Sequence, residues 1–266
     1  MDDEPIPSRI MTAADLARFP SPPADHTIAY GEDPLQFGEL RLPEGPGPHP
    51  IMTLIHGGVW LAEYDLGHIS HLAAAFAAAG IATWTIEYRR VGNPGGGWPG
   101  TFEDVSAAGD FVVNLARRHP LDLRRAIIAG HSAGGHLVAM LMATDWDALG
   151  RADVGAAIRG GLAISGIYDL APLLQTSINI EARLDATSAR TLSPAYSRPV
   201  VDAPLALAVG GDESAEFKRQ AELISSRWSN ALPMQEVPGT HHFSVLEELA
   251  VPGSVPWRQL EALLAG

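Results

Sequence analysis

The chain has 266 residues, of which 46% are hydrophobic and 18% charged, and its formal net charge is −13. This composition is typical of a large globular domain with a substantial core, and the negative charge argues against nucleic acid and anionic membrane surfaces as partners. The chain contains no cysteine, which excludes disulfides, a thiolate nucleophile and cysteine-based metal sites.

Residues 1–24 contain five prolines and several charges, and they predict an extended arm with a short helix near Thr12–Arg18. The first residues, Met1–Pro5, are acidic and lack the basic-then-apolar order of a signal peptide. The longest apolar stretch, Leu72–Ile86, is too short to span a bilayer. We therefore expect a cytoplasmic location and no membrane partner, with residues 25–266 forming a single domain.

Strand and helix patterns alternate along most of this domain, after two antiparallel strands at His26–Tyr30 and Gln36–Leu42. The strands predicted next are Pro50–Ile55, Ile81–Ile86, Arg125–Ala129, Ile158–Ser165, Pro204–Val209 and Met234–Val237. The predicted helices are Leu66–Ala79, Phe102–His119, Gly135–Ala143, Glu216–Asn230, His242–Ala250 and Val255–Leu264. Such alternation predicts an α/β protein with a mostly parallel, doubly wound sheet flanked by helices, and ligands bind such sheets at the carboxyl ends of the strands. Residues 166–199 are expected to form an inserted segment.

The pentapeptide Gly130–Gly134 has the sequence G-H-S-A-G and lies between a predicted strand and a predicted helix. That context is typical of a nucleophile elbow, in which the serine occupies a strained turn and the glycines avoid collisions with neighbouring backbone. Ser132 is therefore predicted as a nucleophile on an α/β-hydrolase sheet.

A serine hydroxyl needs a general base, and the base needs a carboxylate to hold its tautomer. On this kind of sheet the order along the chain is serine, acid, histidine. The loop after the strand at 204–209 supplies Asp212 and Glu213, and the loop after the last strand supplies His241 and His242. We favour His242, because it begins the terminal helix and precedes an apolar residue, whereas spacing leaves the two acids nearly equal.

An oxyanion needs backbone N–H donors. We expect the N–H of Ala133 to be one donor and those of Gly58 and Val59, in the loop His56-Gly57-Gly58-Val59, to be the others. His56 is expected to have a structural role in this loop.

Several further side chains are candidates for the substrate pocket or for a metal. We expect Trp60, His131 and Tyr168 to line the pocket. His68 and His71 have a helical i, i+3 spacing that metals can use, but the sequence offers no evident third ligand. The sequence therefore predicts no metal and no cofactor.

The segments 56–60 and 130–137 resemble the arylformamidase (kynurenine formamidase) branch of the α/β-hydrolases, which is related to the hormone-sensitive-lipase-like esterases. Residues 165–173, 176–179, 192–194, 213–220 and 242–243 are similar to further motifs of that branch. The resemblance covers about residues 50 to 250, and it implies that the insertion follows the sixth strand. A valine, Val59, replaces the third glycine of the lipase-like loop, which favours the formamidase branch.

The resemblance implies that Glu213 is the catalytic acid, although members of the family more often carry aspartate at this position. It also implies His242 as the base. The expected function is that of a serine hydrolase that cleaves small-molecule carboxylic esters or arylformamides through an acyl-enzyme on Ser132, with a homodimer as one possible assembly. The alternative is a non-catalytic binding module with the same fold.

Overall fold

The computed structural model describes residues 22–266. The helix predicted near Thr12–Arg18 and nearly all of the predicted arm lie outside the described residues. The strands are β1 (His26–Ala29), β2 (Phe37–Arg41), β3 (His49–Ile55), β4 (Ala82–Ile86), β5 (Leu121–His131), β6 (Gly161–Ile164), β7 (Leu205–Gly210) and β8 (Gln235–Val237). The longer helices are α2 (Gly67–Ala78), α3 (Gly100–Ala116), α4 (Ala133–Met142), α8 (Ala215–Arg227) and α10 (Val255–Ala265).

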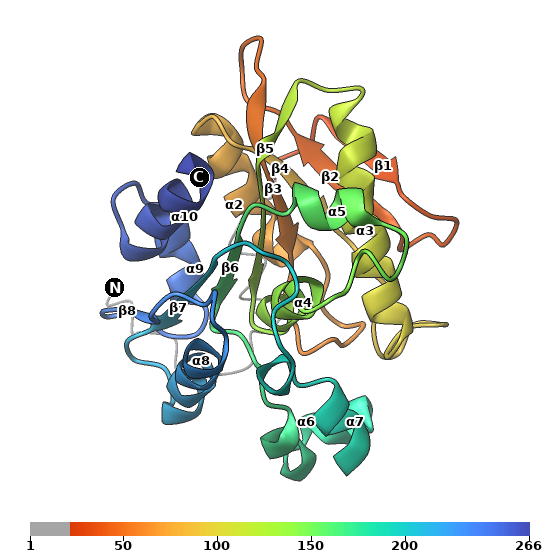
Figure 1. Cartoon of the computed structure of the whole chain (residues 1–266), viewed down its shortest axis with the longest axis vertical. Helices are drawn as coiled ribbons and strands as arrows, with labels where there is room; N and C mark the ends of the chain where they lie inside the picture. The colour runs from red at the N-terminus through yellow and green to blue at the C-terminus, as the bar shows by residue number, and fades with distance from the viewer. Residues whose placement is uncertain (1–21) are drawn as a thin grey trace, which may run out of the picture.

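The eight described strands form one sheet in the order β1-β2-β4-β3-β5-β6-β7-β8. β1 and β2 pair antiparallel to their neighbours, and the six strands from β4 to β8 are parallel. Helices cover both faces of the sheet, with α2 and α10 on one side and α3, α4 and α8 on the other (Figure 1). The prediction of a mostly parallel, doubly wound sheet is therefore confirmed.

The central strand β3 shows why both faces are covered. Successive side chains of a strand point to opposite faces, and Ile51 and Ile55 belong to the core under α3 and α4, whereas Met52 and Leu54 belong to the core under α2 and α10. All four side chains are 3% exposed or less. A strand that is apolar on both faces must lie inside a layered α/β domain.

The segment between β6 and β7 extends beyond the carboxyl ends of the strands, at the bottom of Figure 1. It contains the short helices η1 (Ala171–Gln175), α6 (Ile178–Ala182), α7 (Ala186–Thr191) and η2 (Pro194–Tyr196). It lies where the insertion at 166–199 was predicted, and it contributes side chains to the cavity described below.

The strand predicted at Ile158–Ser165 is shorter in the structure, where residues 158–160 connect a short helix, α5 (Ala152–Ala157), to β6. Val154 anchors this helix in the core at 1% exposure. The last short helix, α9 (Ser244–Leu249), begins two residues after the predicted start at His242. None of the helices formed by residues 22–266 combines the length and the apolar composition needed to cross a bilayer.

Candidate active site

Ser132 occupies the turn between β5 and α4 with φ 55° and ψ −117°, a strained conformation for a residue with a side chain. A Cβ atom on Gly130 would lie 2.4 Å from the main chain of Gly134, and one on Gly134 would lie 2.1 Å from the carbonyl oxygen of Ile55. Only glycine fits at these two positions, so the chain can make this turn and present the serine at the carboxyl edge of the sheet.

The Glu213 side chain is fully buried and holds the His242 ring, with 2.8 Å between Glu213 Oε2 and His242 Nδ1. The other carboxylate oxygen accepts a hydrogen bond of 2.7 Å from the Gly210 N–H and one from the Ser165 hydroxyl. Three donors from three strand ends therefore fix this carboxylate and orient the imidazole.

Asp212 and His241, which precede Glu213 and His242 in the chain, do not take part in this pair. Asp212 is exposed to solvent. The His241 ring lies at the start of α9, where its Nδ1 accepts from the N–H groups of Phe243 and Ser244 at 3.3 and 3.4 Å. Of the two acids and two histidines that the sequence offered, Glu213 and His242 are the pair that meet.

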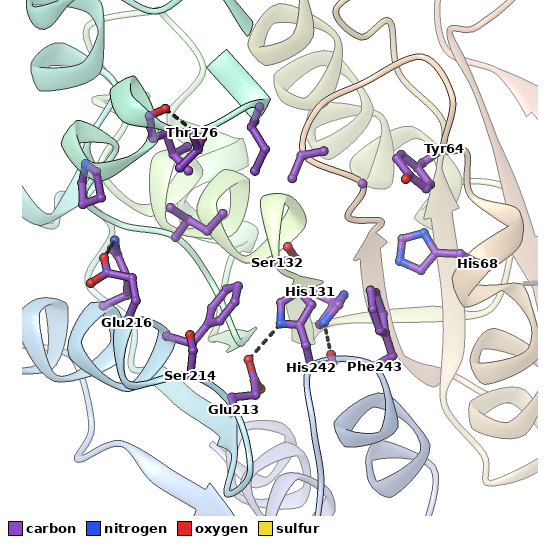
Figure 2. A pocket seen from close by; sticks show the side chains of 18 residues that line it. Tyr64, His68, His131, Ser132, Thr176, Glu213, Ser214, Glu216, His242 and Phe243 are labelled. Atoms are coloured by element: carbon purple, nitrogen blue, oxygen red, sulfur yellow. Dashed lines mark hydrogen bonds and ion pairs between the residues drawn. The ribbon is translucent and has the colours of Figure 1, made fainter. Parts of the chain in front are cut away.

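Ser132, His242 and Glu213 all line one cavity, and Figure 2 shows the imidazole between the serine and the carboxylate. The ring stacks on Phe217, with 4.3 Å between ring centroids. Within residues 22–266 no hydrogen bond joins the Ser132 hydroxyl to the His242 ring. Such contacts are often loose in a free enzyme and tighten when substrate binds.

His131 lines the same cavity, as predicted from the sequence. Its Nε2–H donates to the main-chain carbonyl of His242 at 2.7 Å. Burial holds the pKa of His131 well below the usual histidine value, so the ring is neutral at pH 7. The side chain connects the elbow to the loop that carries His242.

The backbone N–H groups of Gly58, Val59 and Ala133 donate no hydrogen bond to any atom of residues 22–266. Gly58 and Val59 line the cavity together with Ser132. The backbone here is strained: φ is 104° at Gly58, 46° at Val59 and 60° at Trp60. Free N–H donors beside a nucleophile are what a developing oxyanion requires.

Buried side chains hold this strained loop. The Gly57 N–H donates to His68 Nε2 at 3.3 Å, and the ring of His56 donates from Nδ1 to the Gly57 carbonyl at 2.8 Å. Burial lowers the pKa of His68 to about 3. His68 therefore acts as a neutral acceptor for the loop, and residues 22–266 contain no group of three His, Cys, Asp or Glu side chains that could hold a metal ion.

Glu87 lies behind the oxyanion loop and binds the side chain of His56, which holds that loop. It follows β4, is 2% exposed, and lies 3.2 Å from His56 Nε2, beside the guanidinium of Arg90. Its second oxygen accepts from the Leu66 N–H at 3.1 Å. Burial alone would raise the pKa of Glu87, but the His56 hydrogen bond and the Arg90 charge lower it below its usual value. Glu87 is therefore a buried anion that joins the oxyanion loop to the start of α2.

The cavity has a volume of about 370 Å³, a size that fits a small organic molecule. Two residues predicted for its wall, Trp60 and Tyr168, do not line it. The positive φ at Trp60 turns its ring to the far side of the loop, where it packs edge-on against His136 at 5.0 Å and lines a smaller cavity of about 80 Å³. Tyr168 is fully buried in the core below the strand ends.

Sequence reasoning did not single out Ser165, Glu87 or Phe217. Ser165 is the last residue of the strand predicted at Ile158–Ser165, and Glu87 directly follows the strand predicted at Ile81–Ile86, so their positions at predicted strand ends were a usable signal. Phe217 lies in the first turn of α8, four residues after Glu213, and no motif in the sequence marks it.

The sheet order, the serine at the turn after the central strand β5 and the cavity at the carboxyl edge define a serine hydrolase of the α/β-hydrolase class. The BD-FAE family model matches residues 40–181, which is more than half of the chain. The chain belongs to the BD-FAE family.

Two curated relatives match over most of the chain. Kynurenine formamidase of Salmo salar is 27% identical over 260 residues, which cover 90% of this chain and 81% of the relative. Kynurenine formamidase of Danio rerio is 29% identical over 242 residues, which cover 84% of this chain and 75% of the relative. The predicted resemblance to the arylformamidase-like branch is confirmed.

Solved structures agree with this assignment. A crystal structure of a "putative thioesterase" from Silicibacter sp. TM1040 has a TM-score of 0.75 and 34% identity, and covers 90% of this chain and 84% of its own. Esterase B from Lactobacillus rhamnosus has a TM-score of 0.76 over 95% of this chain and 91% of its own, and its 18% identity supports the fold alone. The chain is an enzyme of this class, and the alternative of a non-catalytic binding module is not favoured.

Proposed function

We propose that this enzyme hydrolyses small arylformamides or carboxylic esters through an acyl-enzyme on Ser132. The Ser132 oxygen attacks the substrate carbonyl carbon, and its proton moves to Nε2 of His242. The Glu213 carboxylate stabilises the resulting imidazolium. The N–H groups of Gly58, Val59 and Ala133 bind the oxyanion.

The tetrahedral intermediate then collapses. The C–O bond of an ester or the C–N bond of a formamide breaks, and the alcohol or arylamine leaves with the proton from His242. The acyl or formyl group stays on Ser132 as an ester. Water attacks this ester with His242 as base, which releases the carboxylic acid or formic acid and restores the serine. The reaction needs no cofactor.

The observation that carries this proposal is the hydrogen bond between Glu213 Oε2 and His242 Nδ1, beside a serine held at φ 55°. A carboxylate on Nδ1 leaves Nε2 free to take the serine proton. Support for the substrate class comes from the relatives, two of which are named kynurenine formamidases.

A stopped-flow measurement with an activated aryl ester tests the mechanism. We expect a burst of phenol equal to the concentration of enzyme, followed by slower turnover, because an acyl-enzyme accumulates before water releases it. Ser132→Ala should abolish the burst and reduce turnover about 10⁶-fold. A folded Ser132→Ala enzyme with near-full turnover would refute the role of Ser132.

A substrate panel tests the substrate class. It compares N-formylkynurenine with neutral formanilides and with aryl esters of short and medium chain length. Turnover of the formanilides at kcat/KM values equal to or above those of the esters would support an arylformamidase. Exclusive turnover of esters would make the enzyme a carboxylesterase.

A cytoplasmic location and a homodimer stay predictions from the sequence. Fractionation of the source cells tests the first, and light scattering on the purified protein tests the second.

A further inference from the structure

The charges around the cavity carry an inference about the substrate. Among the residues that the structure describes, no lysine or arginine lines the cavity. Glu213 and Glu216 do, and Figure 2 shows Glu216 at the left of the cavity and Glu213 at its lower centre, beside His242. Seven apolar side chains make up much of the remaining wall: Val59, Ile167, Pro172, Leu173, Ile178, Phe217 and Phe243.

Two of the histidines that line the cavity cannot act as cations at neutral pH. Burial lowers the pKa of His68 to about 3 and that of His131 well below the usual value. Each ring also has a partner in the protein, since His68 accepts from the Gly57 N–H and His131 donates to the His242 carbonyl. A substrate anion in the cavity would find no cationic partner in either ring.

Lys218 and Arg219, the two cations that closely follow Glu216 on α8, are already paired within the protein. Arg219 donates to Glu216 through two hydrogen bonds of 2.7 Å and to Asp169 through one of 3.1 Å. Two carboxylates thus share one guanidinium. We call these three residues, Glu216, Asp169 and Arg219, the rim of the cavity, and together they carry a net charge of −1. The ammonium of Lys218 is bound to the Gly211 carbonyl and to Glu236, at 2.8 and 2.9 Å.

We propose that the cavity selects substrates whose group remote from the scissile carbonyl is neutral, zwitterionic or cationic, and rejects substrates whose remote group is a carboxylate with no ammonium beside it. The inference rests on the hydrolase function proposed above and names the substrate class of the same site. A carboxylate that enters loses its hydration among apolar side chains, gains no cation from residues 22–266 and meets the negative rim. An ammonium group at the same place would face the half-exposed Glu216 carboxylate.

The test uses three phenyl acetates with a para-ethyl chain that ends in a methoxy, carboxylate or ammonium group, and the three matching formanilides. The two-carbon spacer keeps the reactivity of the leaving group nearly constant. We expect kcat/KM for the carboxylate compound to be at least tenfold below that for the methoxy compound. We expect kcat/KM for the ammonium compound to equal or exceed that for the methoxy compound. Equal values for carboxylate and methoxy would overturn the charge selection alone. A lack of turnover of both methoxy compounds would refute the proposed function, and with it this inference.

Glu216→Gln removes one negative charge from the rim, and Glu222→Gln is the matched control, since it lies on the same helix, is exposed and does not line the cavity. Glu216→Gln should raise the carboxylate-to-methoxy ratio of kcat/KM at least threefold, whereas Glu222→Gln should leave that ratio and the methoxy turnover unchanged. Since the rim is partly exposed, 0.5 M salt should screen its charge and raise the carboxylate-to-methoxy ratio of kcat/KM toward 1. An unchanged ratio in Glu216→Gln would contradict the role of the rim.

Discussion

The imidazole of His131 donates a hydrogen bond of 2.7 Å to the main-chain carbonyl of His242, a residue 111 positions later in the chain. This bond joins the turn that carries the proposed nucleophile to the loop that carries the proposed base. The two rings also lie 4.5 Å apart between centroids. The distance between serine and base therefore depends on a side chain that takes no proton itself.

We predict that His131→Ala lowers kcat about 100-fold with a smaller effect on KM, because misplacement of a base by about 1 Å costs that much. His131→Gln should recover most of the activity, since its amide N–H can reach the same carbonyl. Steady-state kinetics of both variants on one aryl ester check this. Equal losses in the two variants would show that the hydrogen bond is not what matters.

The paired histidines give a second prediction. His242→Ala should lose activity about as far as a nucleophile variant does, on the order of 10⁶-fold. His241→Ala should keep activity within about tenfold, because its ring caps α9 and does not reach the cavity. The measurement is kcat/KM for both proteins on one ester, with circular dichroism to confirm folding. An inactive His241→Ala beside an active His242→Ala would move the role of base to His241.

The third prediction tests Glu213 as the catalytic acid, again by comparing variants of two adjacent residues. Glu213→Gln keeps the shape but removes the charge that stabilises the imidazolium, and in a serine protease the equivalent change costs about 10⁴-fold in kcat. Asp212→Asn should cost less than about tenfold, because an exposed carboxylate contributes little. A large loss for Asp212→Asn with little change for Glu213→Gln would reverse the assignment.

The elbow and the order of serine, acid and histidine could be predicted from the sequence, because each depends on a short motif next to a strand end. The choice between Asp212 and Glu213 could not be made from spacing, since it depends on which side chain points inward from the loop after β7. The direction of Trp60 was mispredicted for a similar reason. Three consecutive positive φ angles turn the ring away from Ser132, and no residue pattern predicts a positive φ at a valine and a tryptophan.

The structural role of His56 in the oxyanion loop was predicted from the sequence, but its pairing with Glu87 was not, because the two residues are 31 positions apart and meet only in the folded sheet. We predict that Glu87→Gln lowers kcat about 10- to 100-fold with KM nearly unchanged, since loss of one oxyanion donor costs about 10²–10³. Glu103→Gln, an exposed change of the same kind on α3, is the control. Full kcat in a folded Glu87→Gln enzyme would show that the loop does not need this carboxylate.

The last prediction concerns stability in acid. The His136 ring is buried, donates from Nε2 to the Leu192 carbonyl at 2.7 Å, and has its pKa lowered by burial to about 4. Between about pH 6.5 and pH 4 the unfolded chain binds a proton at this residue that the folded protein does not. Stability therefore falls as the pH drops through this window, by about 1.4 kcal/mol per pH unit for this one group.

His136→Gln keeps an N–H donor for the Leu192 carbonyl and removes the titration. We expect its free energy of unfolding, from urea melts at pH 7, 6 and 5, to fall less steeply with acid than that of the unmodified protein. The difference between the two slopes isolates His136, because the other histidines whose pKa burial lowers, His68 and His131 among them, are present in both proteins. Parallel curves would mean that His136 takes up its proton equally in the folded and unfolded states.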